Sequence, residues 1–292
     1  MTIVRAGDGR VLSVKEWGDR RGRPVFFLHG SPGSTLGPRP RPLRLHSLNI
    51  RLISYDRPGY GDSDRLRGRR VAHAADDVAA IADALGIDRF AVAGRSGGTP
   101  HAMACAALLP HRVTKAALLA PLAPRDAEGL DWYADMDPAN VAAFSVAERG
   151  IEAFERVIGP RADAIRADPV AHLPFAVEDL HASDRRVVSN DAIRQMLTSN
   201  FAEALKRSSA GWIDDVLSFV AGWSFDPARI RVPTLIWHGD RDSLVPPHHG
   251  RWLARRIETA TLRVQGEAGH FGAVEALPDV LHWLGSDPQE PV

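Results

Sequence analysis

The chain has 292 residues, 45% of them hydrophobic, and this length can bury a full core in one large domain or in a domain that carries an insertion. Its 36 basic residues balance its 36 acidic ones, so the excess positive charge that would favour a nucleic-acid partner is absent. The single cysteine, Cys105, excludes an intrachain disulfide, and its alanine-rich surroundings predict a small packed residue. The N-terminus lacks the apolar core of a signal peptide and no apolar run reaches 18 residues, which predicts a cytoplasmic protein without a membrane partner.

Short apolar runs bounded by turn residues predict a mostly parallel sheet that is buried on both faces. Residues 2–6 and 11–17 flank Asp8-Gly9 and predict an antiparallel hairpin at one edge. Residues 71–85 show helical periodicity and lie between two of the predicted strands. This alternation predicts right-handed βαβ units in a three-layer α/β fold. The apolar runs lie at residues 25–28, 50–54, 90–93, 115–120, 234–237 and 261–264.

One gap between predicted strands is too long for a simple crossover. The runs at 115–120 and 234–237 are separated by more than 100 residues, whereas a βαβ unit needs about 30. Helical patterns occur within the gap at residues 141–157, 191–206 and 210–220. We therefore expect a helical lid at residues 125–226, inserted between core segments of residues 1–124 and 227–292.

A G-x-S-x-G motif, Gly94-Arg-Ser-Gly-Gly98, follows the run at 90–93 and precedes a predicted helix at 100–109. Glycines on both sides allow a sharp turn that lifts the Ser96 hydroxyl clear of a sheet, as a nucleophile requires. An earlier loop, His29-Gly-Ser-Pro-Gly33, also follows a strand. The backbone N–H groups of Ser31 and Gly97 are the expected oxyanion hole, and we interpret His29 as a packing residue.

These stretches resemble enzymes of the α/β-hydrolase fold, in the superfamily of lid-bearing esterases, lactonases and epoxide-hydrolase-like proteins. The resemblance covers the core but not the lid. It implies a triad in the order nucleophile, acid, histidine, which gives Ser96, Asp242 and His270. Asp240 and Asp126 remain alternatives for the acid. The matching stretches are His29-Gly-Ser-Pro-Gly33, Asp56-Arg-Pro-Gly-Tyr-Gly-Asp-Ser63, Gly94-Arg-Ser-Gly-Gly98, Gly239-Asp-Arg-Asp-Ser-Leu-Val-Pro246 and Ala268-Gly-His-Phe271.

Three residues of this chain differ from the motifs of particular enzymes of this fold, and each difference argues against the activity of those enzymes. Epoxide hydrolases and haloalkane dehalogenases of this fold use an aspartate nucleophile, whereas position 96 is serine. The proline iminopeptidase loop would carry glycine in place of Ser31 and tryptophan in place of Gly97. Haloperoxidases and perhydrolases usually have a bulky residue after the serine, so Gly97 also argues against them.

Several other polar residues are interpreted as structural. Asp56 to Ser63 should shape the turn after a buried strand. Arg95 could bind an anionic group, but we expect it to pack behind the nucleophile. The remaining histidines have no partners at metal-ligand spacing, so no metal site is predicted, and we interpret them as solvated or packing residues; they include His101, His238, His248 and His249.

The predicted activity is hydrolysis of a carboxylic ester-type bond through an acyl-enzyme on Ser96, with no metal or organic cofactor. A lactonase, thioesterase, C–C bond hydrolase, lyase or cyclase would use the same triad, and a catalytically silent ligand-binding protein is the alternative of another class. Lid aromatics predict a small, largely apolar substrate, although we expect most of them to pack lid against core. The oligomeric state is left open. The aromatics are Trp132, Tyr133, Phe144, Phe154, Phe175, Trp212, Phe219, Trp223 and Phe225.

Overall fold

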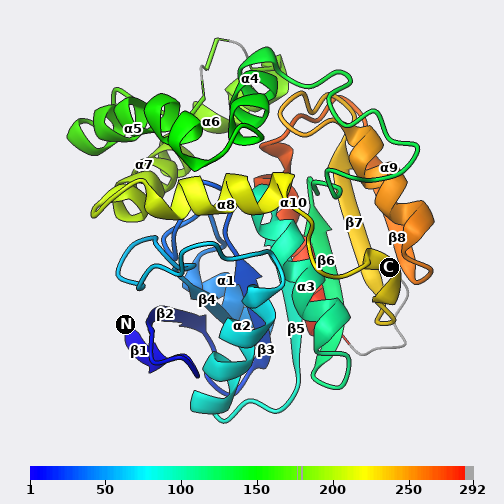
Figure 1. The fold of residues 1–292 in the computed structure, drawn as a ribbon. Coiled ribbons are helices and arrows are strands. Elements are labelled where there is room, and N and C mark those ends of the chain that lie inside the picture. The colour runs from blue at the N-terminus through cyan, green and yellow to red at the C-terminus, as the bar shows by residue number, and fades with distance from the viewer. Residues whose placement is uncertain (176, 179, 287–292) are drawn as a thin grey trace.

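The structure, a computed structural model, describes residues 1–175, 177–178 and 180–286, and is built on one eight-stranded sheet (Figure 1). Its strands lie in the order β1-β2-β4-β3-β5-β6-β7-β8. β2 pairs antiparallel with β1 and with β4, and all other pairs are parallel. The edge hairpin and the parallel sheet are thereby confirmed. The strands are β1 (Thr2–Arg5), β2 (Val11–Gly18), β3 (Arg23–Leu28), β4 (Ile50–Tyr55), β5 (Phe90–Arg95), β6 (Val113–Leu119), β7 (Thr234–Gly239) and β8 (Ala260–Gln265).

Helices cover both faces of the sheet. On one face α2, α3 and α9 pack against the strands, and on the other face α1 and α10 do so. The helices are α1 (Pro42–Ser47), α2 (His73–Ala84), α3 (Thr99–Leu108), α4 (Pro138–Ala147), α5 (Ile151–Ala167), α6 (Ala182–Val188), α7 (Asp191–Leu205), α8 (Ala210–Val220), α9 (Pro247–Arg256) and α10 (Gly272–Gly285), with 3₁₀ turns η1 (Ser96–Gly98) and η2 (Pro227–Arg229).

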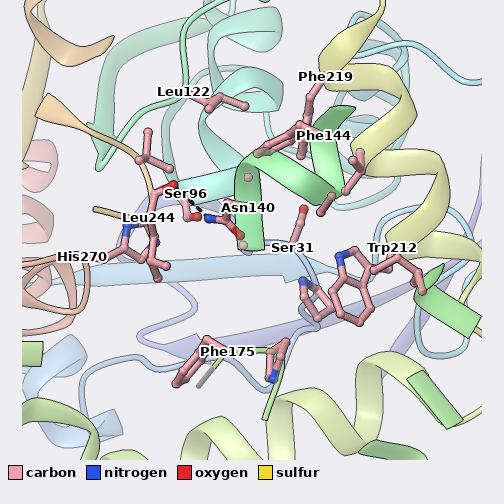
Figure 2. A pocket seen from close by; sticks show the side chains of 18 of the residues that line it. Ser31, Ser96, Leu122, Asn140, Phe144, Phe175, Trp212, Phe219, Leu244 and His270 are labelled. Atoms are coloured by element: carbon pink, nitrogen blue, oxygen red, sulfur yellow. Dashed lines mark hydrogen bonds between the residues drawn. The ribbon is translucent and has the colours of Figure 1, made fainter. Parts of the chain in front are cut away.

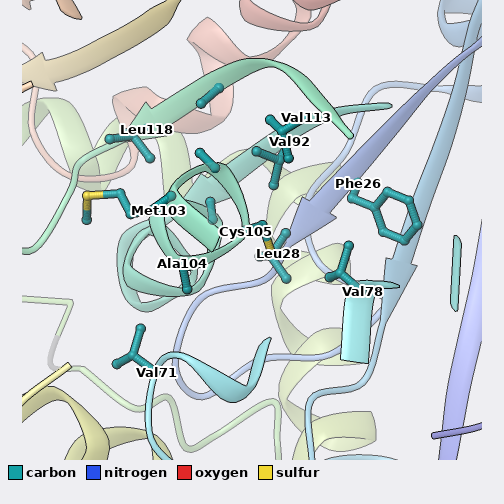
Figure 3. Packing of buried hydrophobic residues seen from close by; sticks show 14 of the residues in the cluster. Phe26, Leu28, Val71, Val78, Val92, Met103, Ala104, Cys105, Val113 and Leu118 are labelled. Atoms are coloured by element: carbon teal, nitrogen blue, oxygen red, sulfur yellow. The ribbon is translucent and has the colours of Figure 1, made fainter. Parts of the chain in front are cut away.

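Helix α3 lies at the centre of the main hydrophobic core (Figure 3). It begins at Thr99 with Pro100 in its first turn, where a missing N–H costs nothing. Apart from Met103, the residues from Ala102 to Ala107 are small and let the helix approach β5 and β6 closely. Cys105 is fully buried in this cluster, and burial raises the pKa of its thiol, so the prediction of a packed residue is confirmed.

Five helices, α4 to α8, lie between β6 and β7 in the chain and gather over one end of the sheet (Figure 1). The predicted helices at 191–206 and 210–220 correspond to α7 and α8. The helical pattern at 141–157 falls on two helices, since α4 ends at Ala147, α5 begins at Ile151, and Gly150 between them has a φ of 103°, which an α-helix cannot contain. We keep the name lid for residues 125–226, as a proposed division of the chain.

The outermost parallel strand, β8, departs from the expectation of strands buried on both faces. Most of its residues are exposed, since it forms the edge of the sheet and has a neighbouring strand on one side only. Across the described ranges, no helix has the length and apolar character needed to cross a membrane.

Candidate active site

The turn between β5 and α3 raises Ser96 out of the sheet. β5 ends at Arg95, and Ser96 has a φ of 52°, a left-handed conformation that residues other than glycine rarely adopt. Gly98 is required, because a methyl group there would lie 2.6 Å from the carbonyl oxygen of His29. The Thr99 hydroxyl donates to the Ser96 carbonyl at 2.7 Å and closes the turn. This is the strained elbow that the G-x-S-x-G motif predicts.

Asp242 and His270 follow the last two strands and meet at the carboxyl edge of the sheet. Oδ2 of Asp242 lies 2.8 Å from Nδ1 of His270, and Oδ1 accepts the Val245 N–H at 2.9 Å. Burial acts to raise the pKa of the Asp242 carboxyl, but the interactions with His270 and His238 outweigh it, so the pKa is lowered. Asp242 therefore stays ionised and fixes the orientation of the His270 ring.

His270 and Ser96 line the same pocket, and their side chains lie beside each other in Figure 2. Within the described part of the chain, no hydrogen bond joins the Ser96 hydroxyl to the His270 ring. Such bonds in hydrolases are often long before a substrate binds and shorten in the complex. The arrangement thus contains a hydroxyl, an imidazole and an oriented carboxylate around one cavity.

The two other candidates for the acid lie elsewhere. Oδ1 of Asp240 lies 3.9 Å from Nε of Arg241, as expected for a residue that braces the loop. Asp126 lines a separate cavity with Trp223 and Arg256. Of the three carboxylates considered from the sequence, Asp242 is the one that contacts His270.

His238, the penultimate residue of β7, is a second partner of Asp242. Its Nε2 lies 2.7 Å from the Val245 carbonyl oxygen and 3.4 Å from Oδ2 of Asp242. The ring is fully buried, so it packs beneath the acid loop rather than meeting solvent. The sequence signal for this position was its place near the end of a buried strand, four residues before the acid.

Ser31 and Gly97 face each other beside the nucleophile. A methyl group on Gly97 would lie 2.7 Å from Cβ and 3.1 Å from the backbone nitrogen of Ser31, so only glycine fits. In the described residues, no oxygen accepts the N–H of Ser31 or of Gly97. Both donors are therefore available to a ligand oxygen at the position expected of an oxyanion hole.

The pocket around Ser96 is mostly apolar, and Figure 2 shows the side chains that surround it. Five of the nine lid aromatics named from the sequence line it, as does a tenth, Phe201, whereas we predicted that most would pack lid against core. No group of three His, Cys, Asp or Glu side chains in the described ranges is arranged to hold a metal ion. The five aromatics are Phe144, Phe154, Phe175, Trp212 and Phe219.

Comparison with known proteins identifies the family. Residues 23–277 match the family model described as alpha/beta hydrolase fold. The chain belongs to this family. As an enzyme of the α/β-hydrolase superfamily, it is 28% identical to a non-heme haloperoxidase from Rhodococcus erythropolis, over 91% of this chain and 88% of the relative. It is 28% identical to a 2-hydroxy-6-oxo-2,4-heptadienoate hydrolase from Pseudomonas putida, over 87% of this chain and 84% of the relative.

The fold is also that of solved α/β hydrolases. The crystal structure of an esterase from Rhodococcus sp. ECU1013 superposes with a TM-score of 0.69 at 21% identity, covering 98% of both chains. At this identity the likeness shows the fold alone. The relatives carry names of several reactions, so the bond that this hydrolase cleaves has to be argued from its own site.

The lid of this α/β hydrolase contributes a buried carboxylate that contacts the loop carrying Ser31. Asp215, on α8, is fully buried and accepts a hydrogen bond from the Ser31 hydroxyl. Burial acts to raise the pKa of Asp215, but the charges of Arg57 and Arg69 outweigh it and hold the pKa well below its usual range. Its other partners are Arg57 (2.5 Å), Arg69 (2.6 Å), Tyr60 (2.8 Å) and His101 (3.2 Å).

Arg57 connects this carboxylate to the loop that carries Ser31. Its guanidinium donates to the carbonyl oxygens of His29 and Gly30, the latter at 3.0 Å, and to the Ser31 hydroxyl at 3.0 Å. Nδ1 of His29 lies 2.8 Å from the Gly30 carbonyl oxygen, which agrees with its predicted packing role. The segment from Asp56 thus makes structural contacts, and the structure it supports is the loop that carries Ser31.

A second lid carboxylate holds the loop of the catalytic histidine candidate. Asp184, on α6, accepts the backbone N–H of His270 at 2.9 Å and that of Phe271 at 2.7 Å. A methyl group on Gly269 would lie 2.6 Å from Oδ1 of Asp184, so glycine makes room for this contact. We call Asp184 and Asp215 the lid anchors.

Arg95 differs from expectation. We predicted that it packs behind the nucleophile, but it lines the pocket together with Ser96. A methyl group added to Gly30 would lie 3.7 Å from Nη2 of Arg95 and also 3.7 Å from Cβ of Ser96, so both side chains approach the same point of the pocket wall.

Proposed function

We propose that this α/β hydrolase cleaves a carboxylic ester-type bond through an acyl-enzyme on Ser96. The observation that carries the proposal is the 2.8 Å contact of ionised Asp242 with His270, in a pocket that Ser96 also lines. An imidazole oriented in this way keeps its second nitrogen for proton transfer, which is the requirement for activating a serine hydroxyl.

In the proposed reaction the Ser96 oxygen attacks the ester carbonyl carbon, and His270 takes the hydroxyl proton through Nε2. The negative oxygen of the tetrahedral intermediate accepts the N–H groups of Ser31 and Gly97. His270 then gives its proton to the leaving alcohol, and water cleaves the acyl-enzyme by the same steps in reverse. Asp242 remains ionised throughout and stabilises the imidazolium.

Covalent labelling tests this proposal. A fluorophosphonate should add once per chain, at Ser96, because a serine beside a base and two N–H donors reacts far faster than an ordinary hydroxyl. Intact-protein mass spectrometry measures the adduct, and peptide mapping locates it. Ser96→Ala should remain unlabelled and His270→Ala should label much more slowly. Undiminished labelling of Ser96→Ala would rule out the assignment.

A C–C bond hydrolase is the second candidate, because the Pseudomonas putida relative is named as the hydrolase of an oxo-dienoate. Lactones and thioesters would also suit the proposed triad. Product analysis separates these reactions: ester cleavage releases an alcohol and an acid, whereas C–C cleavage releases an acid and a carbon fragment without a new hydroxyl. Gly97 continues to argue against the haloperoxidase and perhydrolase activities.

A further inference from the structure

Arg95 is a buried cation without a hydrogen-bond or ion-pair partner among the described residues. Its side chain is 7% exposed, yet its guanidinium forms neither a hydrogen bond nor an ion pair with any residue described. The guanidinium lies over the aromatic ring of Phe271, whose centroid is 5.9 Å from Cζ. Burial alone lowers the pKa of Arg95, to about 10, with no neighbouring charge acting on it. An arginine remains charged at neutral pH under these conditions, so the cost of its burial is not offset.

Two other deeply buried arginines, unlike Arg95, have a carboxylate partner. Arg57 and Arg69 are at least as buried as Arg95, and both share the carboxylate of Asp215. Arg57 also donates to two carbonyl oxygens. The fold therefore supplies acceptors to Arg57 and Arg69, whereas the residues that the structure describes supply none to Arg95. This contrast indicates that the acceptor for Arg95 comes from outside the chain.

The surroundings of Arg95 favour an anionic ligand. No Asp or Glu from the described ranges lines the pocket, and the other cation there, Arg161, already donates to the Pro174 carbonyl oxygen at 2.6 Å. Neither lid anchor lines the pocket: Asp215 contacts the Ser31 hydroxyl, and Asp184 contacts the backbone of His270 and Phe271. An anion entering beside Ser96 thus meets Arg95 without a competing carboxylate.

We propose that Arg95 binds a carboxylate in the acyl part of the substrate, so that the hydrolase prefers esters of short dicarboxylic acids. The proposal rests on the ester hydrolysis proposed above. A carboxylate matches the planar guanidinium in shape and charge, and the one lining cation that lacks an acceptor among the described residues suits one negative charge. Because Arg95 adjoins Ser96 in sequence and space, the contact would persist in the acyl-enzyme.

The kinetic test compares two esters of equal acyl length, mono-4-nitrophenyl glutarate and 4-nitrophenyl pentanoate, after subtraction of uncatalysed hydrolysis. The ratio of kcat/KM for the anionic ester to that for the neutral ester should fall by about 30- to 100-fold in Arg95→Met, the loss expected for a charge-assisted hydrogen-bonded pair. Arg95→Lys should retain part of the ratio. Arg161→Met is the matched control, and it should change the ratio by less than about threefold.

A binding measurement separates the failure of this proposal from the failure of the proposed function. By calorimetry, glutarate should bind to Ser96→Ala at least about tenfold more tightly than to Ser96→Ala with Arg95→Met. If both esters are cleaved and the ratio is unchanged in Arg95→Met, the anion site is wrong and the esterase proposal stands. If neither ester is cleaved while glutarate binding depends on Arg95, the anion site stands and the esterase proposal fails.

Discussion

Asp242 has more partners than orientation of one imidazole requires. One carboxylate oxygen contacts His270 and lies near His238, and the other accepts the Val245 amide. An acid held on both oxygens cannot rotate away when the imidazole becomes charged, so the tautomer of His270 is fixed before substrate arrives. The sequence located this acid by motif resemblance, but the part played by His238 depends on a contact that no spacing rule describes.

Replacement by asparagine should therefore lower kcat far more at Asp242 than at Asp240 or Asp126, the two alternative acids. Asp242→Asn should lower kcat by about three to four orders of magnitude, because an amide favours the wrong imidazole tautomer. Asp240→Asn and Asp126→Asn should each cost about tenfold or less. Steady-state hydrolysis of a 4-nitrophenyl ester measures all three. A mild Asp242→Asn beside a crippled Asp126→Asn would place the acid after β6 instead.

Asp215 offers a test with an internal control one residue away. Asp215→Asn should lower the free energy of unfolding by about 3–5 kcal/mol, since it leaves two buried guanidinium groups without a counter-charge. It should also lower kcat, because the Ser31 loop loses its anchor. Asp214 pairs with the more exposed Arg65, so Asp214→Asn should cost about 1–2 kcal/mol and leave kcat nearly unchanged. Urea unfolding and ester hydrolysis measure both; equal losses in the two variants would contradict the assigned role.

At the scale of elements, the strands were the most predictable feature and the lid was the least. Strands buried on both faces leave continuous apolar runs in the sequence, and each run found its strand. The break between α4 and α5 was missed because the pattern of apolar residues continues through Gly150. The lid anchors could not be predicted, because Asp215 contacts Ser31 across 184 positions of sequence and Asp184 contacts His270 across 86.

The contact of Asp184, on α6, with the His270 loop can be tested by a substitution at Gly269. Gly269→Ala should lower kcat at least about tenfold, because the added methyl would press on Asp184 and displace the loop by a few tenths of an ångström or more. Gly266, in the same loop, has open space around the added methyl, so Gly266→Ala should keep nearly full activity. Hydrolysis rates compare the pair. Full activity of Gly269→Ala would show that the anchor does not position His270.

For the whole molecule, buried histidines couple stability to pH. Burial, aided by the nearby charge of Arg57, lowers the pKa of His101 to about 4. Burial, aided by the neighbouring His248, lowers the pKa of His249 to about 3. In the unfolded chain a histidine takes up its proton near pH 6.5. Between about pH 6.5 and 4 the unfolded state thus binds more protons, so the free energy of unfolding falls as pH is lowered.

Each of the two histidines should contribute up to about 1.4 kcal/mol per pH unit within that window. Urea unfolding at pH 7, 6 and 5 measures the slope. His101→Gln and His249→Gln should each flatten it, whereas His111→Gln, at an exposed position, should leave it as in the unsubstituted protein. A slope that neither buried substitution alters would mean that other groups set the acid limit of stability.

The two lid anchors also constrain how this chain could exchange parts with its relatives. A foreign insert joined between β6 and β7 would have to bring one carboxylate to the amides of residues 270 and 271 and another to the guanidinium groups of Arg57 and Arg69. An insert without these carboxylates would cover the pocket but leave the loops that carry Ser31 and His270 without their lid contacts. Recombinants should therefore keep Asp184 and Asp215 whenever they keep this core. The lid aromatics that line the pocket remain free to diversify toward new substrates.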